Sequence, residues 1–209
     1  KKYIDQMENK DQWTIIAVPS PSWATKVFPE LEEKEAVEKL WEAIMKTTRL
    51  DQGDAVEAWE KHIAYLKEKS EKMNALNLDY LTYKASNGTD LRIKLQPNHV
   101  WLSARETSLQ GIEFSANMPT EEVFTMPKRD GVDGVVYSTK PLSLQGQLVE
   151  NFKFTFEKGK IVKVEAEKGL DVLETTLDMD ESSRYLGEVA LVPFNSPINE
   201  TGILFSNTL

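Results

Sequence analysis

The first third of the chain spaces its hydrophobic residues as a buried strand and amphipathic helices do. Residues 13–18 (WTIIAV) form an apolar run that stops at Pro19, which is typical of a buried strand leading into a loop. Apolar residues then recur three and four positions apart, which predicts an amphipathic helix: Val37, Leu40, Trp41, Ile44 and Met45. This order of elements favours an α/β layer.

A second helix is predicted after Gly53. Asp54 and Glu57 have the spacing of a capping box, although Asp replaces the usual Ser or Thr. The apolar stripe of this helix would consist of Val56, Trp59, Ile63 and Leu66. Two helices after a strand suggest the last portion of a larger α/β layer.

From residue 79 the hydrophobic period changes to two, which indicates strands. Asn87-Gly88 suits a tight turn between residues 80–84 and 91–95, and Lys158-Gly159 does the same between residues 152–156 and 161–164. Further apolar runs predict short strands at residues 100–102, 111–115, 123–126, 134–138 and 189–192. A short helix is expected around residues 170–177. The predicted fold class is therefore α+β (mixed α/β), with a change of character near residue 78.

Composition narrows the function classes. The chain has 209 residues, of which 40% are hydrophobic and 28% charged, and it has no apolar run long enough to span a membrane. That length allows one large domain or two smaller ones. A net charge of −9 disfavours nucleic acid, an anionic membrane surface and acidic substrates as partners.

The chain contains no cysteine and only two histidines, His62 and His99. Disulfides, thiolate nucleophiles and cysteine-based zinc sites are therefore excluded. The chain also starts at Lys1 without a signal pattern and stops at Leu209 just after an apolar stretch. We therefore expect an internal fragment, which can carry part of a functional site.

Two groups of carboxylates stand out as candidate chemistry. Glu121 and Glu122 stand together before an apolar strand, so the pleat should send one into a cleft and the other to solvent. Glu188 lies between apolar residues and would need a partner if it were buried. Each glutamate could be a solvated surface group, part of a structural ion pair, or a metal or catalytic group. Two carboxylates could also serve as the acid and base of a glycosidase.

Several motifs together resemble one family. They are NMPTEEVFTMP (residues 117–127), a turn around residues 141–146, FEKGKIV (156–162), RYLGEVALVPFNSPI (184–198) and ILFSNTL (203–209). These segments resemble the thermophilic leucyl aminopeptidase family of metallopeptidases, which comprises aminopeptidase T, aminopeptidase S and PepS. Residues 13–29 and 76–95 are also similar to the family, so the resemblance covers essentially the whole chain.

The resemblance implies roles for two residues. Glu122 matches the second Glu of TEEVFT and Glu188 matches the Glu of LGEVAL, and in the family both are ligands of a dinuclear metal site. The family's other ligands lie downstream of this chain, and His62 and His99 match none of them. Carboxylate and imidazole ligands suit zinc, cobalt or manganese. No other catalytic or cofactor-binding residue is assigned.

The resemblance also implies an activity and an organisation. Residues 1–78 would be the end of an amino-terminal α/β domain, and residues 79–209 the β-rich first part of the catalytic domain. The complete protein would be a cytoplasmic, homodimeric aminopeptidase with two divalent metal ions, acting on peptides with a free N-terminus. This chain alone would be inactive and would hold metal weakly. A non-catalytic β-rich interaction module stays open as the alternative, and a glycosidase as a weaker one.

Overall fold

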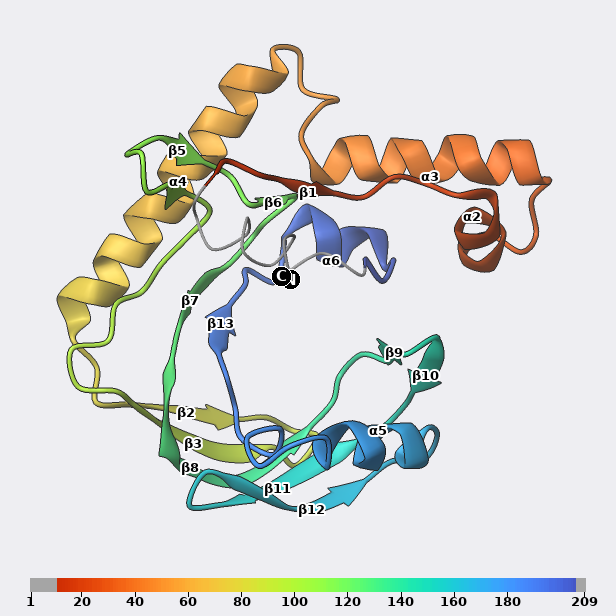
Figure 1. The fold of residues 1–209 in the computed structure, drawn as a ribbon. Coiled ribbons are helices and arrows are strands. Elements are labelled where there is room, and N and C mark those ends of the chain that lie inside the picture. Colours follow the sequence, from red (N-terminus) through yellow and green to blue (C-terminus); the bar gives the residue numbers. More distant parts are fainter. Residues whose placement is uncertain (1–10, 206–209) are drawn as a thin grey trace. The chain divides into compact units, whose positions relative to one another are not determined.

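In the computed structural model, which describes residues 11–205, the chain forms two compact units. The first unit takes its described residues from 11–72, 102–123 and 191–205, and the second from 73–101 and 124–190. Helices and strands both contribute throughout, which confirms the mixed α and β class (Figure 1). The expected division at residue 78 into parts of two family domains stays a prediction. Lys1 and Leu209 lie outside the described residues.

Most of the helices belong to the first unit. The two predicted helices are α3 (Glu33–Thr47) and α4 (Ala55–Leu76). Residues on α2 (Pro21–Val27), α3 and the segments beside them form one core: Ala17, Ala24, Ala36, Leu40, Ile44 and Phe205. The last helix of the unit is the short α6 (Pro197–Thr201).

The apolar stripes of α3 and α4 were predicted only in part. Leu40 and Ile44 are buried as expected, and so are the predicted core residues of α4 other than Val56, which is 73% exposed. Trp41 and Met45 are exposed as well, because the buried stripe of α3 is narrower than the predicted one and is completed by Ala36 and Thr47.

The strands of the first unit are short. The strand predicted at residues 13–18 is reduced to β1 (Ile15–Ile16), which pairs in parallel with β6 (Asn117–Met118). A second pair joins β4 (Glu106–Thr107) and β5 (Glu113–Phe114). No strand forms at residues 100–102 within the described structure. Local apolar runs mark these segments, but pairing between distant segments decides which of their residues become strand.

A five-stranded antiparallel sheet dominates the second unit (Figure 1). Its order is β12-β11-β8-β3-β2, so two hairpins flank the long central strand β8 (Pro127–Tyr137). The hairpin of β2 (Tyr80–Lys84) and β3 (Asp90–Leu95) turns at Asn87-Gly88, where Gly88 has φ +99°. The hairpin of β11 (Lys153–Glu157) and β12 (Lys160–Glu165) turns at Lys158-Gly159. Both predicted hairpins are confirmed.

One face of this sheet is apolar. Leu91, Ile93 and Leu95 alternate with exposed residues along β3, as a half-buried strand requires. A small hairpin of β9 (Leu142–Leu144) and β10 (Gln147–Val149) extends from the unit. The predicted helix α5 (Leu170–Leu177) packs against β10 and β12.

Two further strands carry the chain between the units. Strand β7 (Val123–Thr125) pairs with β13 (Val189–Leu191) in a sheet of their own. Glu122 is the residue before β7, and Glu188 is the residue before β13. Each predicted site residue therefore stands at the start of one strand of this pair.

Candidate metal centre

Glu122 belongs to the first unit and is fully inside it. Its side chain is 5% exposed, and the residues from Pro119 to Val123 are all buried. A carboxylate in such a position must be compensated by hydrogen bonds, by a counter-charge or by a metal ion. The segment that carries Glu122 therefore lies in the interior of the unit, and the residues on either side of Glu122 are buried with it.

Arg49 compensates the adjacent carboxylate, Glu121. The guanidinium atom Nη1 lies 2.8 Å from Oε1 of Glu121, and the two side chains are only 12% and 4% exposed. Oε1 accepts no well-directed hydrogen bond from the described residues, so this contact acts through charge. Arg49 follows the end of α3 in a left-handed conformation (φ +61°), which places its side chain beyond the helix end.

His62 on α4 holds the same segment through its backbone. Its Nε2 donates a hydrogen bond of 2.7 Å to the carbonyl oxygen of Thr120, and it lies 3.7 Å from Oε1 of Glu121. Burial lowers the pKa of His62 below its usual 6.5 and outweighs the opposing effects of the Thr120 hydrogen bond and the Glu121 charge. Thr120 and Glu121 are thus fixed by two helices immediately before Glu122.

The expectation that one of the paired glutamates faces solvent was wrong. Glu121 is 3% exposed and Glu122 is 5% exposed. They precede β7 instead of lying in it, so the alternation of a pleated strand does not apply to them. Arg49 makes the burial of Glu121 possible by supplying the counter-charge.

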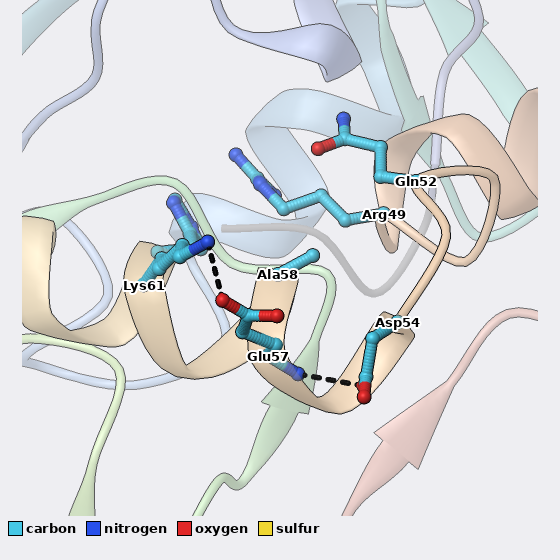
Figure 2. A pocket seen from close by; sticks show the side chains of 7 residues that line it. Arg49, Gln52, Asp54, Glu57, Ala58 and Lys61 are labelled. Carbon is cyan, nitrogen blue, oxygen red and sulfur yellow. Dashed lines mark hydrogen bonds and ion pairs between the residues drawn. The ribbon is translucent and has the colours of Figure 1, made fainter.

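An open pocket of about 340 Å³ lies beside this cluster in the first unit (Figure 2). Its lining includes Arg49 and His62 together with charged residues of α4 and the preceding turn. Lys61 pairs with Glu57 at 2.7 Å, and Arg49 pairs with Glu121. Since both cations of the lining are already paired and the lowered pKa keeps His62 neutral, the pocket offers little attraction to an anion.

Glu188 belongs to the second unit, and its surroundings differ from those of Glu122. The side chain is exposed at the rim of an apolar pocket, and no residue among 11–205 gives it a hydrogen bond or an ion pair. The apolar neighbourhood still desolvates the carboxyl enough to raise its pKa above the usual value. Because Glu188 is exposed, the partner that it would need if it were buried is not required.

The apolar pocket has a volume of about 530 Å³ and lies entirely within the second unit. It is bounded by the apolar face of the five-stranded sheet and by the segment that leads into β13. Tyr83 on β2 forms part of the wall, and its buried hydroxyl has no hydrogen-bond partner among the described residues. Burial raises the pKa of Tyr83, so this hydroxyl stays neutral.

The residues present fit a divalent cation in part. Glu188 has no hydrogen-bond or ion-pair partner among the described residues and lies in an environment that disfavours its charge, so a bound cation would relieve that penalty. Glu122 adds a second, buried carboxylate. No group of three or more His, Cys, Asp or Glu residues able to hold a metal occurs among residues 11–205. Because Glu122 and Glu188 lie in different units, their sharing of one site stays a prediction.

The two histidines lie outside the motifs that carry Glu122 and Glu188. His62 lies on a helix, and His99 lies in a loop where its Nδ1 is 3.0 Å from the carbonyl oxygen of Gln96.

Among the helices that the structure describes, none has the length and apolar character of a membrane span.

Sequence reasoning missed Arg49 and Tyr83. Arg49 comes after a helix rich in charged residues, and nothing local distinguishes it from a solvated cation. Tyr83 lies at an inward-facing position of its predicted strand. The other walls of its pocket come from three further strands and from a segment distant in sequence. Only knowledge of the long-range pairing could have revealed either residue.

The whole chain is similar to known metallopeptidases. The family described as thermophilic metalloprotease (M29) matches residues 1–209. Aminopeptidase AmpS of Bacillus subtilis (strain 168) is 52% identical over 209 residues, which are 100% of this chain and 50% of that protein. Aminopeptidase T of Thermus thermophilus is 48% identical over 197 residues, 94% of this chain and 48% of the relative.

A solved structure gives the same result. The structure of wild-type AmpT from Thermus thermophilus superposes on this chain with a TM-score of 0.88 at 44% sequence identity. The match covers 98% of this chain and 50% of the AmpT chain. The chain thus spans about half the length of the relatives that it matches. The resemblance expected from the TEEVFT and LGEVAL motifs is confirmed, and the chain belongs to the thermophilic metalloprotease (M29) family.

Proposed function

We propose that Glu122 and Glu188 are metal ligands of an aminopeptidase that removes N-terminal residues such as leucine from peptides. The observation that carries this proposal is the carboxylate of Glu188 within the LGEVAL motif, which has no partner within residues 11–205, in a chain of a metalloprotease family. The aminopeptidase names of the relatives support the reaction. Membership of this family favours the proposal over an interaction module or a glycosidase.

The chain's own residues would contribute charge, orientation and exclusion of water. Glu122 and Glu188 supply anionic oxygen donors, which divalent cations such as zinc, cobalt and manganese accept. Arg49 and His62 hold the residues before Glu122 and so restrict the directions in which its carboxylate can point. Divalent ions, when bound, supply Lewis acidity and lower the pKa of water.

Finer features of the proposal rest on the family resemblance alone. They are the presence of two metal ions, the choice among zinc, cobalt and manganese, a homodimer, and a cytoplasmic location. Peptides with a free N-terminus are the proposed substrates. The inactivity of this chain on its own also stays a prediction.

Replacement of Glu188 by its isosteric amide tests the proposal. In the full-length protein, Glu188→Gln removes the charge but keeps the shape, so metal-stimulated release of N-terminal leucine should fall by at least about 100-fold. The measurement is the rate of leucine release after loading with zinc or cobalt. Glu174→Gln, at an exposed position of α5, is the matched control and should retain the wild-type rate. Undiminished activity of the Glu188 variant would remove this residue from the metal site.

A further inference from the structure

Two buried side chains from the helices of the first unit contact the residues directly before Glu122. We infer that Arg49 and His62 are positioning residues, which hold this segment and thereby orient the carboxylate of Glu122 toward the metal. Neither side chain acts as a ligand itself. The inference rests on the proposed function, because it takes Glu122 to be a metal ligand.

The two contacts fall on consecutive residues and restrain different parts of the chain. His62 donates a hydrogen bond of 2.7 Å from Nε2 to the carbonyl oxygen of Thr120, so it restrains the backbone. Arg49 places Nη1 at 2.8 Å from Oε1 of Glu121, so it restrains a side chain. Thr120 and Glu121 are buried, and all the residues involved belong to the first unit. Two fixed points in succession leave the next residue, Glu122, few directions.

Both positioning side chains are themselves held in place. The Nη1 atom of Arg49 also donates a hydrogen bond of 3.3 Å to the carbonyl oxygen of Thr47, which is fully buried near the end of α3. The imidazole of His62 packs against two aromatic rings of α4, with ring centroids 5.6 Å from Trp59 and 6.4 Å from Tyr65. The segment before Glu122 is therefore restrained by side chains that have little freedom of their own.

Partners of this kind matter for a metal site because a ligand must point along the direction that the ion requires. Loss of an outer partner that orients a ligand typically costs about 10–100-fold in metal affinity. A buried ion pair, by contrast, adds little net stability, and apolar residues can replace it as a unit. Orientation of Glu122 and stability of the fold can therefore be separated by experiment.

Arg49→Met and the double substitution Arg49→Met with Glu121→Leu make this separation. In the full-length protein, calorimetric titration with zinc after treatment with a chelator should show affinity lowered about 10–100-fold in both variants. The double variant should regain much of the lost stability but none of the zinc affinity, because the anchor of the segment is absent. Wild-type zinc affinity in the double variant would overturn the inference, even if the single variant failed to fold.

Leu40→Ala is the matched control for a loss of stability alone. Leu40 is fully buried in the core of the first unit, on the helix that precedes Arg49. Its truncation should lower the melting temperature and leave the zinc affinity of the folded protein unchanged. If Leu40→Ala weakened zinc binding as much as Arg49→Met, affinity would merely follow global stability and the positioning role would be wrong.

A double-mutant cycle shows whether Arg49 acts through Glu122. In a Glu122→Gln background the carboxylate to be oriented is gone, so adding Arg49→Met should cause no further loss of zinc affinity. A further loss of tenfold or more would show that Arg49 acts on another part of the site, contrary to the inference.

Conservative replacement tests the second positioning residue. His62→Leu removes the donor to the carbonyl of Thr120 and should weaken zinc binding, whereas His62→Gln keeps a donor and should retain most of the affinity. Equal zinc affinities in these two variants would remove His62 from the positioning role.

Failure of the metal proposal has a different signature from failure of this inference. If Glu122 is not a ligand, Glu122→Gln keeps the zinc affinity of the wild type. If Glu122→Gln loses a tight site while the Arg49 variants bind zinc as the wild type does, the metal assignment stands and the positioning role alone is wrong.

Discussion

Arg49, Glu121, His62 and Thr120 form a buried polar cluster directly before Glu122. Glu121 is one of the least exposed carboxylates in the described structure, and its nearest counter-charge is Arg49 at 2.8 Å. Such a pair contributes little net stability while it is intact, because both charges have lost their hydration. The pair instead fixes the position of the interior segment around Glu121.

Removal of one partner should therefore be costly. Arg49→Met leaves the Glu121 carboxylate buried without its counter-charge, and we expect a loss of about 3–5 kcal/mol in the free energy of unfolding. The double substitution Arg49→Met with Glu121→Leu should recover much of that loss. Urea unfolding of the metal-free protein measures both.

An exposed pair provides the control for this experiment. Lys61 and Glu57 are 73% and 63% exposed, so Lys61→Met should change stability little. If Arg49→Met were as mild as Lys61→Met, Glu121 would have another compensating partner and the buried pair would not organise the segment.

His62 should make stability depend on pH. Its pKa is lowered in the folded state, so below pH 6.5 the unfolded chain gains a proton that the folded chain does not. Stability is thus fully present above pH 6.5 and declines as the pH falls toward the lowered pKa. His62→Gln, which keeps a donor for the Thr120 carbonyl, should reduce the slope of unfolding free energy against pH below 6.5. Equal slopes in urea titrations of the two proteins would contradict this role.

At the residue scale, the two motifs single out Glu122 and Glu188, whose role as metal ligands stays a prediction. The apolar neighbours of Glu188, visible in the sequence, are accompanied in the structure by a raised pKa of its carboxyl. The burial of Glu121 was missed because Arg49, which makes it possible, is distant in sequence. Charge compensation of this kind is a property of the tertiary structure.

At the scale of elements, turns with strong local preferences were the most predictable. Asn87-Gly88 and Lys158-Gly159 both produced the expected hairpins, since their glycines adopt positive φ values of +99° and +84°. Helix α2 was missed because Pro19, at the end of the apolar run, suggested a loop. Pro21 in fact occupies the start of the helix, where its missing N–H costs nothing, and Ser20 caps it. Capping by Ser20 was the signal that could have revealed the helix.

Strand length was less predictable than strand existence. Only residues 134–138 of β8 were expected to be strand, but the strand runs from Pro127 to Tyr137 because β3 and β11 pair with it on either side. Gly131 and Gly134 interrupt its apolar pattern, so the local sequence does not predict the full length of the strand. The pairing of β1 with β6 was equally invisible because it joins distant segments.

Gly159 should be essential to the second hairpin. A Cβ at this position would stand 1.7 Å from the carbonyl oxygen of Arg129, in addition to the strain of φ +84°. Gly159→Ala should therefore destabilise the protein by more than the roughly 1–2 kcal/mol of left-handed strain alone. Gly146→Ala is the matched control, since its φ is +79° and nothing lies within 4 Å of the added carbon. Equal melting temperatures for the two variants would show that the turn adjusts without cost.

At the scale of the whole molecule, the chain carries two compact units and one proposed ligand in each. The chain spans about half the length of the curated relatives that it matches. Family membership was predictable from the paired motifs, whereas the apolar pocket needed the assembled sheet.

Direct metal binding by the full-length protein tests the central claim. After removal of metal with a chelator, calorimetric titration with zinc or cobalt should show tight binding to the wild type and to Glu174→Gln. Glu122→Gln and Glu188→Gln should each lose at least one tight site, because each removes an anionic oxygen donor. Unchanged stoichiometry and affinity in both ligand variants would contradict the assignment of Glu122 and Glu188 to the metal centre.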